Sequence, residues 1–214
     1  MLDLTRVRQE YMRDGLDEKD VLADPLAQFA RWFDDAQNAG LVMPNAMSLA
    51  TVSALGKPSS RVVLLKGVDD GKNGGFVFYT DYDSRKGREV AGNHHASLLF
   101  AWLPLERQIR IDGTIAKVSA AESDAYFATR PLGSRHAAIA SPQSEVIESR
   151  AALAQRFNDA ARAAGENPAR PAHWGGYRLA PVEIEFWQGR ENRLHDRLVY
   201  RKTAQGWRLE RLAP

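Results

Sequence analysis

The sequence predicts a mainly β protein with flanking helices, of the α+β class, whose strands form an antiparallel barrel. From residue 46 to 118, short apolar runs alternate with turn-rich loops such as Gly56-Lys57-Pro58. A second group of apolar runs spans 177–212, and a helical stretch separates the two groups. Strands this short and closely spaced are typical of antiparallel barrels rather than of βαβ units. With 214 residues the chain can bury roughly 70% of its unfolded surface, so one domain over 24–214 is the simplest interpretation.

The first elements can be justified in order. Residues 1–23 are charged and lack a sustained apolar period, which indicates a mobile N-terminal arm. Asp24 and Pro25 supply an N-cap and a first-turn proline for a helix that Gly40 ends. The apolar stripe of this helix comprises Leu26, Phe29, Phe33 and Ala36.

The later elements are expected as follows. The first strands are predicted at 46–53, 59–66, 76–80, 96–102 and 107–118. Helices are predicted at 119–130, opened by a capping box from Ser119 to Glu122, and from 144 to about 164. The last strands are predicted at 177–179, 182–188, 197–202 and 207–212. Alternation in 182–188 places Trp187 on a mixed face, where it is free to reach a ligand.

A cluster of cations near the C-terminus is the most informative motif. If the segment 193–197 is extended, Arg193, His195 and Arg197 project from one face. Because like charges at this spacing repel one another, the pattern indicates an anion site. The alternative is a solvated edge strand whose arginines pair with Glu191 and Asp196.

A second candidate anion site lies at a helix start. Ser84 is the expected N-cap, so Arg85 and Lys86 fall in the first helical turn, where the helix dipole disfavours cations. A phosphate bound by free N–H groups and two cations would explain them. The alternative is an ordinary solvated helix start.

The run from Arg61 to Lys66 has a cation at each end of an apolar strand. Five residues apart, these cations point to opposite faces of a regular strand. Either one of them serves another site, for example across a subunit boundary, or a bulge breaks the alternation. Cations that protect a strand edge from aggregation are an equally good explanation.

A third candidate anion site involves a phenol, a guanidinium and a hydroxyl. Tyr126 and Arg130 lie one turn apart on a helix that stops before Pro131, and Ser134 follows in the next loop. Together they can form a second phosphate clamp. In the alternative, Tyr126 packs and Arg130 faces solvent.

Taken in order, these segments closely resemble the pyridoxine/pyridoxamine 5′-phosphate oxidases, the flavoenzymes that make pyridoxal 5′-phosphate. The resemblance spans the whole chain, and so many colinear segments are far more specific than one short motif. The segments that carry it are Arg8-Gln9-Glu10-Tyr11, Arg61 to Lys66, Phe78-Tyr79-Thr80, Ser84-Arg85-Lys86, Leu105-Glu106-Arg107-Gln108, Tyr126 to Pro131, Gln143-Ser144, Trp174-Gly175-Gly176, Glu185-Phe186-Trp187-Gln188-Gly189, Arg193 to Arg197 and Arg211-Leu212-Ala213-Pro214.

The resemblance implies a dimeric split β-barrel with one FMN in each of two interface sites. The implied reaction is oxidation of pyridoxamine 5′-phosphate and pyridoxine 5′-phosphate by O2 to pyridoxal 5′-phosphate, with release of H2O2. The implied cofactor contacts are Arg61, Val62, Leu64, Leu65, Lys66, Tyr79, Thr80, Arg85, Lys86, Gln108, Gln143, Ser144, Trp187 and Arg197. The implied substrate contacts are Arg8, Tyr11, Lys66, Tyr126, Arg130, Ser134, Arg193 and His195, the last two being the implied catalytic residues over the pyridine ring.

The chain departs from the family pattern after Ser134. Where the family usually reads Gln-Ile-Gly-Ala-Trp, this sequence has Arg135-His136-Ala137-Ala138-Ile139. Loss of the aromatic residue and the glycine is expected to change local packing and the loop path, but not the chemistry.

The composition excludes several other classes of protein. Lys and Arg number 29 against 27 Asp and Glu, and the resulting charge of +2 is too small for a nucleic-acid-binding protein. No cysteine is present, which excludes disulfides and thiolate chemistry and fits a reducing cytosol. No leader or membrane-length apolar run is seen, so a cytoplasmic protein with no membrane association is expected.

Motif searches narrow the chemistry further. His94 and His95 are adjacent in an expected turn and no His-Glu-x-x-His pattern occurs, so no metal site is expected. Nucleophile-elbow, P-loop and Rossmann motifs are also missing.

Two rival interpretations follow from the sequence. One is another split-barrel flavin reductase or oxidase with a different substrate. The other is a non-catalytic protein that binds flavin or pyridoxal phosphate. Such a binder needs Arg85 and Lys86 but has no use for the complete substrate clamp.

Overall fold

The computed structural model describes residues 15–69 and 74–214, which fall into two compact units. Unit 1 contains the described residues up to Leu49 together with Ser97–Gly113 and Pro181–Pro214. Unit 2 contains the described residues of Ala50–Ala96 together with Thr114–Ala180. Arg8 and Tyr11, predicted to close over the substrate, lie outside the described residues, as does most of the predicted arm.

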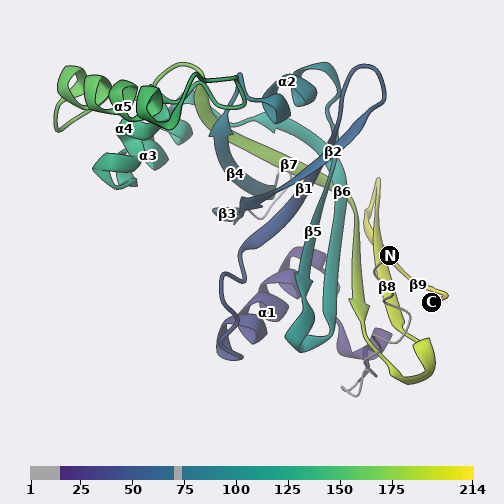
Figure 1. Ribbon diagram of the computed structural model, residues 1–214. Helices are drawn as coiled ribbons and strands as arrows, with labels where there is room; N and C mark the ends of the chain where they lie inside the picture. The colour runs from purple at the N-terminus through teal and green to yellow at the C-terminus, as the bar shows by residue number, and fades with distance from the viewer. Residues whose placement is uncertain (1–14, 70–73) are drawn as a thin grey trace, which may run out of the picture. The chain divides into compact units, whose positions relative to one another are not determined.

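The described chain is mostly antiparallel sheet with flanking helices, so the predicted fold class is confirmed (Figure 1). The helices are α1 (Pro25–Asn38), α2 (Arg85–Gly92), α3 (Ala120–Thr129), α4 (Leu132–Ala140) and α5 (Arg150–Ala164). The strands are β1 (Ala46–Val52), β2 (Pro58–Leu64), β3 (Gly67–Asp69), β4 (Gly75–Asp81), β5 (His95–Trp102), β6 (Arg107–Lys117), β7 (Trp174–Gln188), β8 (Asp196–Thr203) and β9 (Gly206–Leu212). Their order is β2-β1-β5-β6-β7-β4-β3, with β8 on β7 and β9 on β8.

Aromatic packing of α1 forms the core of unit 1. The Asp24 side chain accepts a hydrogen bond from the second residue of the helix, as the N-cap prediction requires. Phe29 then packs edge-on against Phe100 with ring centroids 5.1 Å apart, and Trp32 against Phe186 at 5.2 Å. Trp32 is almost fully buried, although the predicted stripe did not include it.

The start of the described chain is fastened to its end within unit 1. The backbone N–H of Leu16 donates to Asp196 Oδ2 at 2.9 Å. Arg211, in β9, donates to Asp196 Oδ1 at 2.7 Å and to both carboxylate oxygens of Glu18 at 2.8 and 2.7 Å. We call these four residues, Leu16, Glu18, Asp196 and Arg211, the terminal junction.

Unit 2 is organised around the antiparallel pair β4 and β7, in which Phe78 faces Tyr177. Helix α2 follows β4 closely because Gly87 has no side chain: a Cβ there would lie 1.9 Å from the carbonyl oxygen of Tyr82. Helices α3, α4 and α5 follow one another along the chain and lie together in Figure 1.

Several predicted boundaries were wrong in the helical region. The helix expected from 144 begins only at Arg150, where the Ser149 hydroxyl accepts from the N–H of Ala152 at 3.0 Å. Ser144 has a φ of 75°, which no helix accommodates. Ser134, expected in a loop, lies in the first turn of α4, a helix the sequence pattern did not predict.

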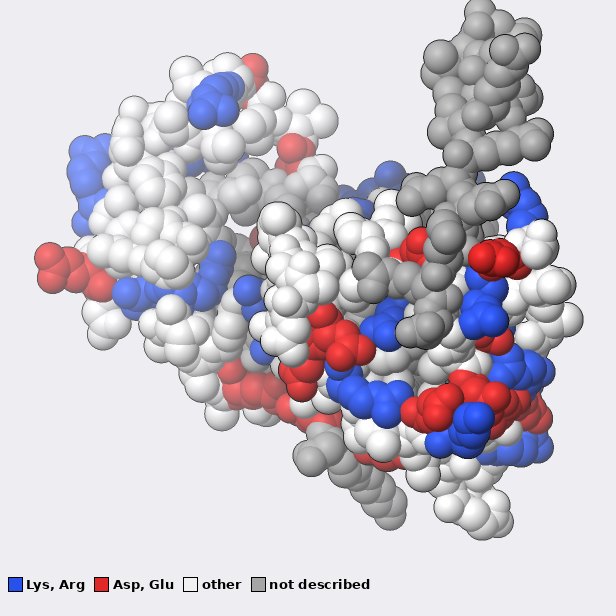
Figure 2. Space-filling view, turned by 90° about the horizontal axis from the view of Figure 1, so that it is seen from below, with Lys and Arg blue, Asp and Glu red and all other residues white. Residues whose placement is uncertain are grey.

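The strand predictions were closer to the structure. The runs 177–179 and 182–188 belong to one long strand, β7, whereas the short β3 was not predicted. Among the described helices, none is both long and apolar enough to cross a membrane. On the face seen in Figure 2, basic and acidic side chains are interspersed, in keeping with a net charge of +2.

Candidate active site

A cavity of about 550 Å³ in unit 2 is lined by several basic side chains. Lys66, Lys86 and Arg130 line it, and none of its described lining residues is a carboxylate. Such a donor set fits an anionic ligand. Of the residues predicted to bind cofactor or substrate, those that line it are Val62, Leu64, Lys66, Tyr79, Thr80, Lys86, Tyr126, Arg130, Ser134 and Gln143.

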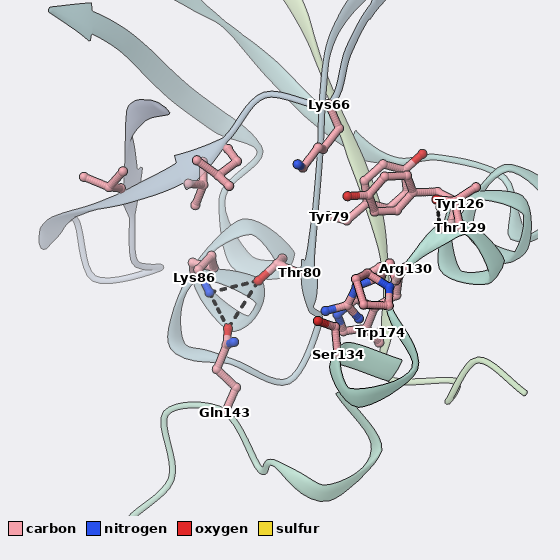
Figure 3. Close-up of a pocket in the computed structure, with 14 residues that line it drawn as sticks. Lys66, Tyr79, Thr80, Lys86, Tyr126, Thr129, Arg130, Ser134, Gln143 and Trp174 are labelled. Atoms are coloured by element: carbon pink, nitrogen blue, oxygen red, sulfur yellow. Dashed lines mark hydrogen bonds between the residues drawn. The ribbon is translucent and has the colours of Figure 1, made fainter. Parts of the chain in front are cut away.

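Lys86 lies at one end of the cavity, at the start of α2 (Figure 3). The predicted cap is confirmed, since the Ser84 hydroxyl accepts from the N–H three residues on. Lys86 Nζ donates to Thr80 Oγ1 at 2.9 Å, to Ser84 Oγ at 3.2 Å and to the amide oxygen of Gln143. Burial and the nearby charge of Arg61 lower the pKa of Lys86. Its partners are neutral oxygens, so its charge remains available to a ligand.

Glu89, which the sequence analysis missed, binds both neighbouring arginines. The carboxylate is 6% exposed and accepts from Arg61 at 3.0 Å and from Arg85 at 2.9 Å. Thr51 and Ser59 donate to it as well, at 2.5 and 2.6 Å. Burial opposes ionisation, but these hydrogen bonds prevail and lower the pKa of Glu89 to about 2. The spacing of four residues between Arg85 and Glu89 on a helix was the available signal.

The strand predicted to carry both Arg61 and Lys66 ends between them, so their side chains need not follow the alternation of one regular strand. β2 ends at Leu64, and the backbone N–H of Lys66 already donates to the carbonyl of Val77 at 2.8 Å. Lys66 therefore lines the cavity, whereas Arg61 turns to Glu89. Leu65, predicted as a cofactor contact, is 7% exposed and belongs to the core instead of the cavity lining.

Tyr126, Arg130 and Ser134 lie at the other end of the cavity (Figure 3). Arg130 caps the C-terminus of α3, and the following proline directs the chain into α4, where Ser134 lies in the first turn. Arg130 Nη1 is buried without a hydrogen-bond partner among the described residues, and burial lowers the pKa of this guanidinium. Arg130 is therefore half-buried in the cavity lining and not fully exposed to solvent. Tyr126 does pack, on Tyr79 with ring centroids 3.8 Å apart, while still lining the cavity.

Glycines next to Trp174 make room for this wall of aromatic side chains. A Cβ on Gly176 would lie 2.7 Å from the Tyr79 ring, so only glycine allows the ring to lie against the strand. Trp174 itself lines the cavity, although the sequence analysis gave it no role.

Unit 1 holds three further predicted cofactor contacts around a cavity of about 210 Å³. Gln108, Trp187 and Arg197 line it, together with Arg110 and Glu185. Arg197 Nε donates to Glu185 at 2.7 Å, and Arg110 Nη2 donates to the same carboxylate at 2.8 Å. Burial opposes ionisation of Glu185, yet the hydrogen bond from Arg197 keeps its pKa low.

The segment 193–197 is not extended, so the predicted shared face of its cations is wrong. Arg193 ends a 3₁₀ turn with a φ of 61°, and β8 begins only at Asp196. His195 lies near Trp187, with ring centroids 4.6 Å apart, and its Nδ1 accepts from the backbone N–H of Arg190 at 3.1 Å. Burial and the charge of Arg193 lower the pKa of His195.

Two other predicted features have definite places in unit 2. Ser144 is exposed and is not among the lining residues of the 550 Å³ cavity. The segment 135–139, where the chain departs from the family pattern, is helical and belongs to α4. Its His136 is 7% exposed, and Nε2 lies 2.7 Å from the carbonyl oxygen of Gly165 at the end of α5.

Comparisons with known proteins agree with this arrangement. The model of the pyridoxamine 5′-phosphate oxidase family matches residues 33–162, and that of the pyridoxine 5′-phosphate oxidase C-terminal dimerisation region matches 174–214. The pyridoxine/pyridoxamine 5′-phosphate oxidase of Paraburkholderia phymatum is 57% identical, with 100% of both chains covered. The structure of PhzG from Burkholderia lata 383, in complex with tetrahydrophenazine-1-carboxylic acid, is 33% identical with a TM-score of 0.86, covering 94% of this chain and 98% of that one.

A more distant structure shares the fold. It is a pyridoxamine 5′-phosphate oxidase-related, FMN-binding protein from Nostoc punctiforme, 20% identical with a TM-score of 0.70, and 87% of this chain and 97% of that chain are covered. The two family models and the full-length relative together show that this chain belongs to the pyridoxamine 5′-phosphate oxidase family of oxidoreductases.

Proposed function

We propose that this chain is an FMN-dependent oxidase that converts pyridoxamine 5′-phosphate and pyridoxine 5′-phosphate to pyridoxal 5′-phosphate with O2, releasing H2O2. The observation that carries the proposal is the cavity of unit 2, which has basic groups at both ends and no described carboxylate in its lining. A single anion would need one such group. Two separate groups support two phosphates, one on the cofactor and one on the substrate.

The residues at the start of α2 fit the phosphate of FMN. The first turn of this helix contains no acidic residue, and the hydrogen-bond partners of Lys86 Nζ among the described residues are neutral oxygens. Free N–H groups at the start of a helix and a nearby ammonium are suited to a phosphate dianion. Arg61 and Arg85, both held by Glu89, would add positive potential.

Gln108, Trp187 and Arg197 are the remaining proposed cofactor contacts. We propose that the chain acts as a homodimer with FMN at the subunit interface, which the match of a dimerisation region to residues 174–214 supports.

When bound, FMN supplies the two-electron acceptor for oxidation at substrate C4′, and its reoxidation by O2 forms H2O2. With pyridoxamine phosphate, oxidation at C4′ gives an imine, which water hydrolyses to pyridoxal 5′-phosphate and ammonia. The protein contributes binding and orientation: Tyr126, Arg130, Ser134 and Lys66 would hold the substrate phosphate. These contacts would fix the position of the reacting carbon.

Arg193 and His195 would orient and polarise the pyridine ring. Because His195 Nδ1 accepts a backbone hydrogen bond and its pKa is lowered, the neutral ring carries its proton on Nε2 near pH 7. In this tautomer Nε2 is a hydrogen-bond donor and the ring adds no charge.

The phosphate requirement provides the test. In air-saturated buffer, peroxide formation should be efficient with pyridoxamine phosphate and several hundredfold slower in kcat/KM with unphosphorylated pyridoxamine, because several charge-assisted contacts of about 1.5–3 kcal/mol each are lost. Arg130→Ala should narrow this gap. Arg162 on α5 has a side chain that is 73% exposed, so Arg162→Ala is the matched control. It should leave the difference in kcat/KM between the two substrates unchanged.

The main rival is an oxidase of the same family with a different substrate. The ligand bound to PhzG, tetrahydrophenazine-1-carboxylic acid, represents this possibility, and it carries a carboxylate but no phosphate. Turnover of that compound, together with equal kcat/KM for the phosphorylated and unphosphorylated pyridoxamines, would overturn the proposal.

A further inference from the structure

Arg130 is held in an unusual way for a half-buried arginine. Its guanidinium carbon lies 4.5 Å from the centre of the Trp174 ring and 5.8 Å from that of Phe127. Arg61, Arg178 and Arg197 all form ion pairs with carboxylates. Within the described part of the chain, Arg130 forms none, and its Nη1 is buried without a partner.

Trp174 is itself fixed in place by other rings. It is 6% exposed and begins β7, opposite Asp81 of β4. Its ring is nearly parallel to those of Tyr126 and Tyr79, at interplanar angles of 6° and 14° and centroid distances of 6.2 and 5.7 Å. Phe127 packs against it edge-on at 5.2 Å. An indole held from several sides offers a rigid face.

The way a cation is held decides which of its donors remain available. A carboxylate holds a guanidinium through its N–H groups and so occupies them. An aromatic face attracts the positive charge through the ring quadrupole and leaves the N–H groups at the guanidinium edge unoccupied. Trp174 therefore orients Arg130 without competing for the hydrogen bonds that a phosphate needs.

We infer that Trp174 is a positioning residue for the substrate phosphate, which it serves by holding Arg130 in the cavity wall through a ring face and not through a carboxylate. This inference rests on the proposed function, because it assigns the substrate phosphate to Arg130. Trp174 is not itself among the proposed cofactor contacts, but its ring lies 5.7 Å from that of Tyr79, which is, so bound flavin is measured in every variant.

Steady-state kinetics of the holoenzyme provide the first test. Trp174→Leu should raise KM for pyridoxamine phosphate about tenfold while changing kcat much less, and Trp174→Phe, which keeps a smaller ring face, should have an intermediate effect. KM for unphosphorylated pyridoxamine and the bound flavin content should not change. Trp102→Phe, at another buried tryptophan, serves as the control and should leave both KM values unaltered.

Direct binding of inorganic phosphate to the holoenzyme, measured by titration calorimetry, separates the inference from the proposed function. If Trp174 acts through Arg130, the variant Arg130→Ala should bind phosphate as weakly with Trp174→Leu added as without it. If the losses of phosphate affinity in the two single variants instead add up in the double variant, the inference is overturned. It is also overturned if Arg130→Ala weakens phosphate binding while Trp174→Phe and Trp174→Leu leave it unchanged.

Other outcomes concern only one of the two claims. Should pyridoxamine phosphate not be a substrate while phosphate affinity still depends jointly on both residues, the proposed function fails, and Trp174 positions Arg130 for the phosphate of another ligand. Should Trp174→Leu fail to fold, Trp174→Phe and its double variant with Arg130→Ala decide the question.

Discussion

Glu89 should contribute far more to stability than its single charge suggests. In the folded chain it is buried and accepts hydrogen bonds from two arginines and two hydroxyls. The pKa of its carboxyl falls from 4.5 to about 2. At 1.36 kcal/mol per unit, this difference corresponds to about 3 kcal/mol of folding free energy at pH 7. Replacing Glu89 by Gln keeps the shape and removes the charge, so we expect a loss of about this size.

The pH dependence has a definite sign. Since folding lowers the pKa, the stabilisation is complete above about pH 5 and is lost as the pH falls from 4.5 towards 2. Urea unfolding followed by tryptophan fluorescence measures the gap in free energy of unfolding between wild type and Glu89→Gln. This gap should be constant from pH 6 to 8. At pH 3.5 the gap should be about 1 kcal/mol smaller. In thermal melts at pH 7 the variant should unfold about 6–12 °C lower.

Glu145 provides a matched control. It also pairs with an arginine, at 2.8 Å, but both side chains are more than half exposed, at 56% and 54%. Glu145→Gln should therefore cost about 1 kcal/mol or less. Equal losses in the two variants, or a gap for Glu89→Gln that does not change between pH 7 and pH 3.5, would refute the reasoning.

Three further predictions concern the cofactor, the substrate and the backbone. Lys86→Ala should weaken FMN binding at least tenfold in a flavin-fluorescence titration, and more than Arg85→Ala does. The reason is that the described partners of Lys86 are neutral oxygens, whereas Arg85 is 64% exposed and already paired with a carboxylate. A larger effect of Arg85→Ala would contradict this ranking. Arg193→Leu should strongly reduce kcat/KM while the purified protein remains yellow, and loss of flavin with turnover retained after reconstitution would place this residue with the cofactor instead. Gly87→Ala should lower the free energy of unfolding in urea by more than about 2 kcal/mol, since the new Cβ would lie 1.9 Å from a backbone carbonyl oxygen. The control Gly133→Ala, whose Cβ would have nothing within 4 Å, should be neutral or stabilising. Similar urea midpoints for the two variants would exclude the steric explanation.

Local signals made most of the fold predictable from the sequence. Asp24, Ser84 and Ser119 cap helices where the pattern placed them, because a cap needs only one side chain and the next few N–H groups. Strand boundaries were close to those observed for a similar reason, since turn residues and alternation act over short distances. The helix start at Arg150 was missed because a positive φ at Ser144 has no clear sequence signature.

The candidate site was harder to predict where non-local contacts decide the outcome. The arrangement of Arg193 and His195 followed from assuming an extended segment, and the 3₁₀ turn before β8 breaks that assumption. Glu89 was missed because its importance comes from Thr51 and Arg61, which are distant in sequence. The resemblance to a family supplied the names of the site residues, but it did not show that Arg130 is held by a ring rather than by a carboxylate.

The terminal junction bears on the order in which a growing chain can complete its structure. Leu16 bonds to a residue 180 positions later, and Glu18 to one 193 positions later. At ribosomal rates of about 5–20 residues per second, the segment around Glu18 waits roughly 10–40 seconds for Arg211 to be made. The segment around Glu18 is therefore synthesised early but is among the last to form its native contacts. A chain that stops short of Arg211 leaves Glu18 without this partner.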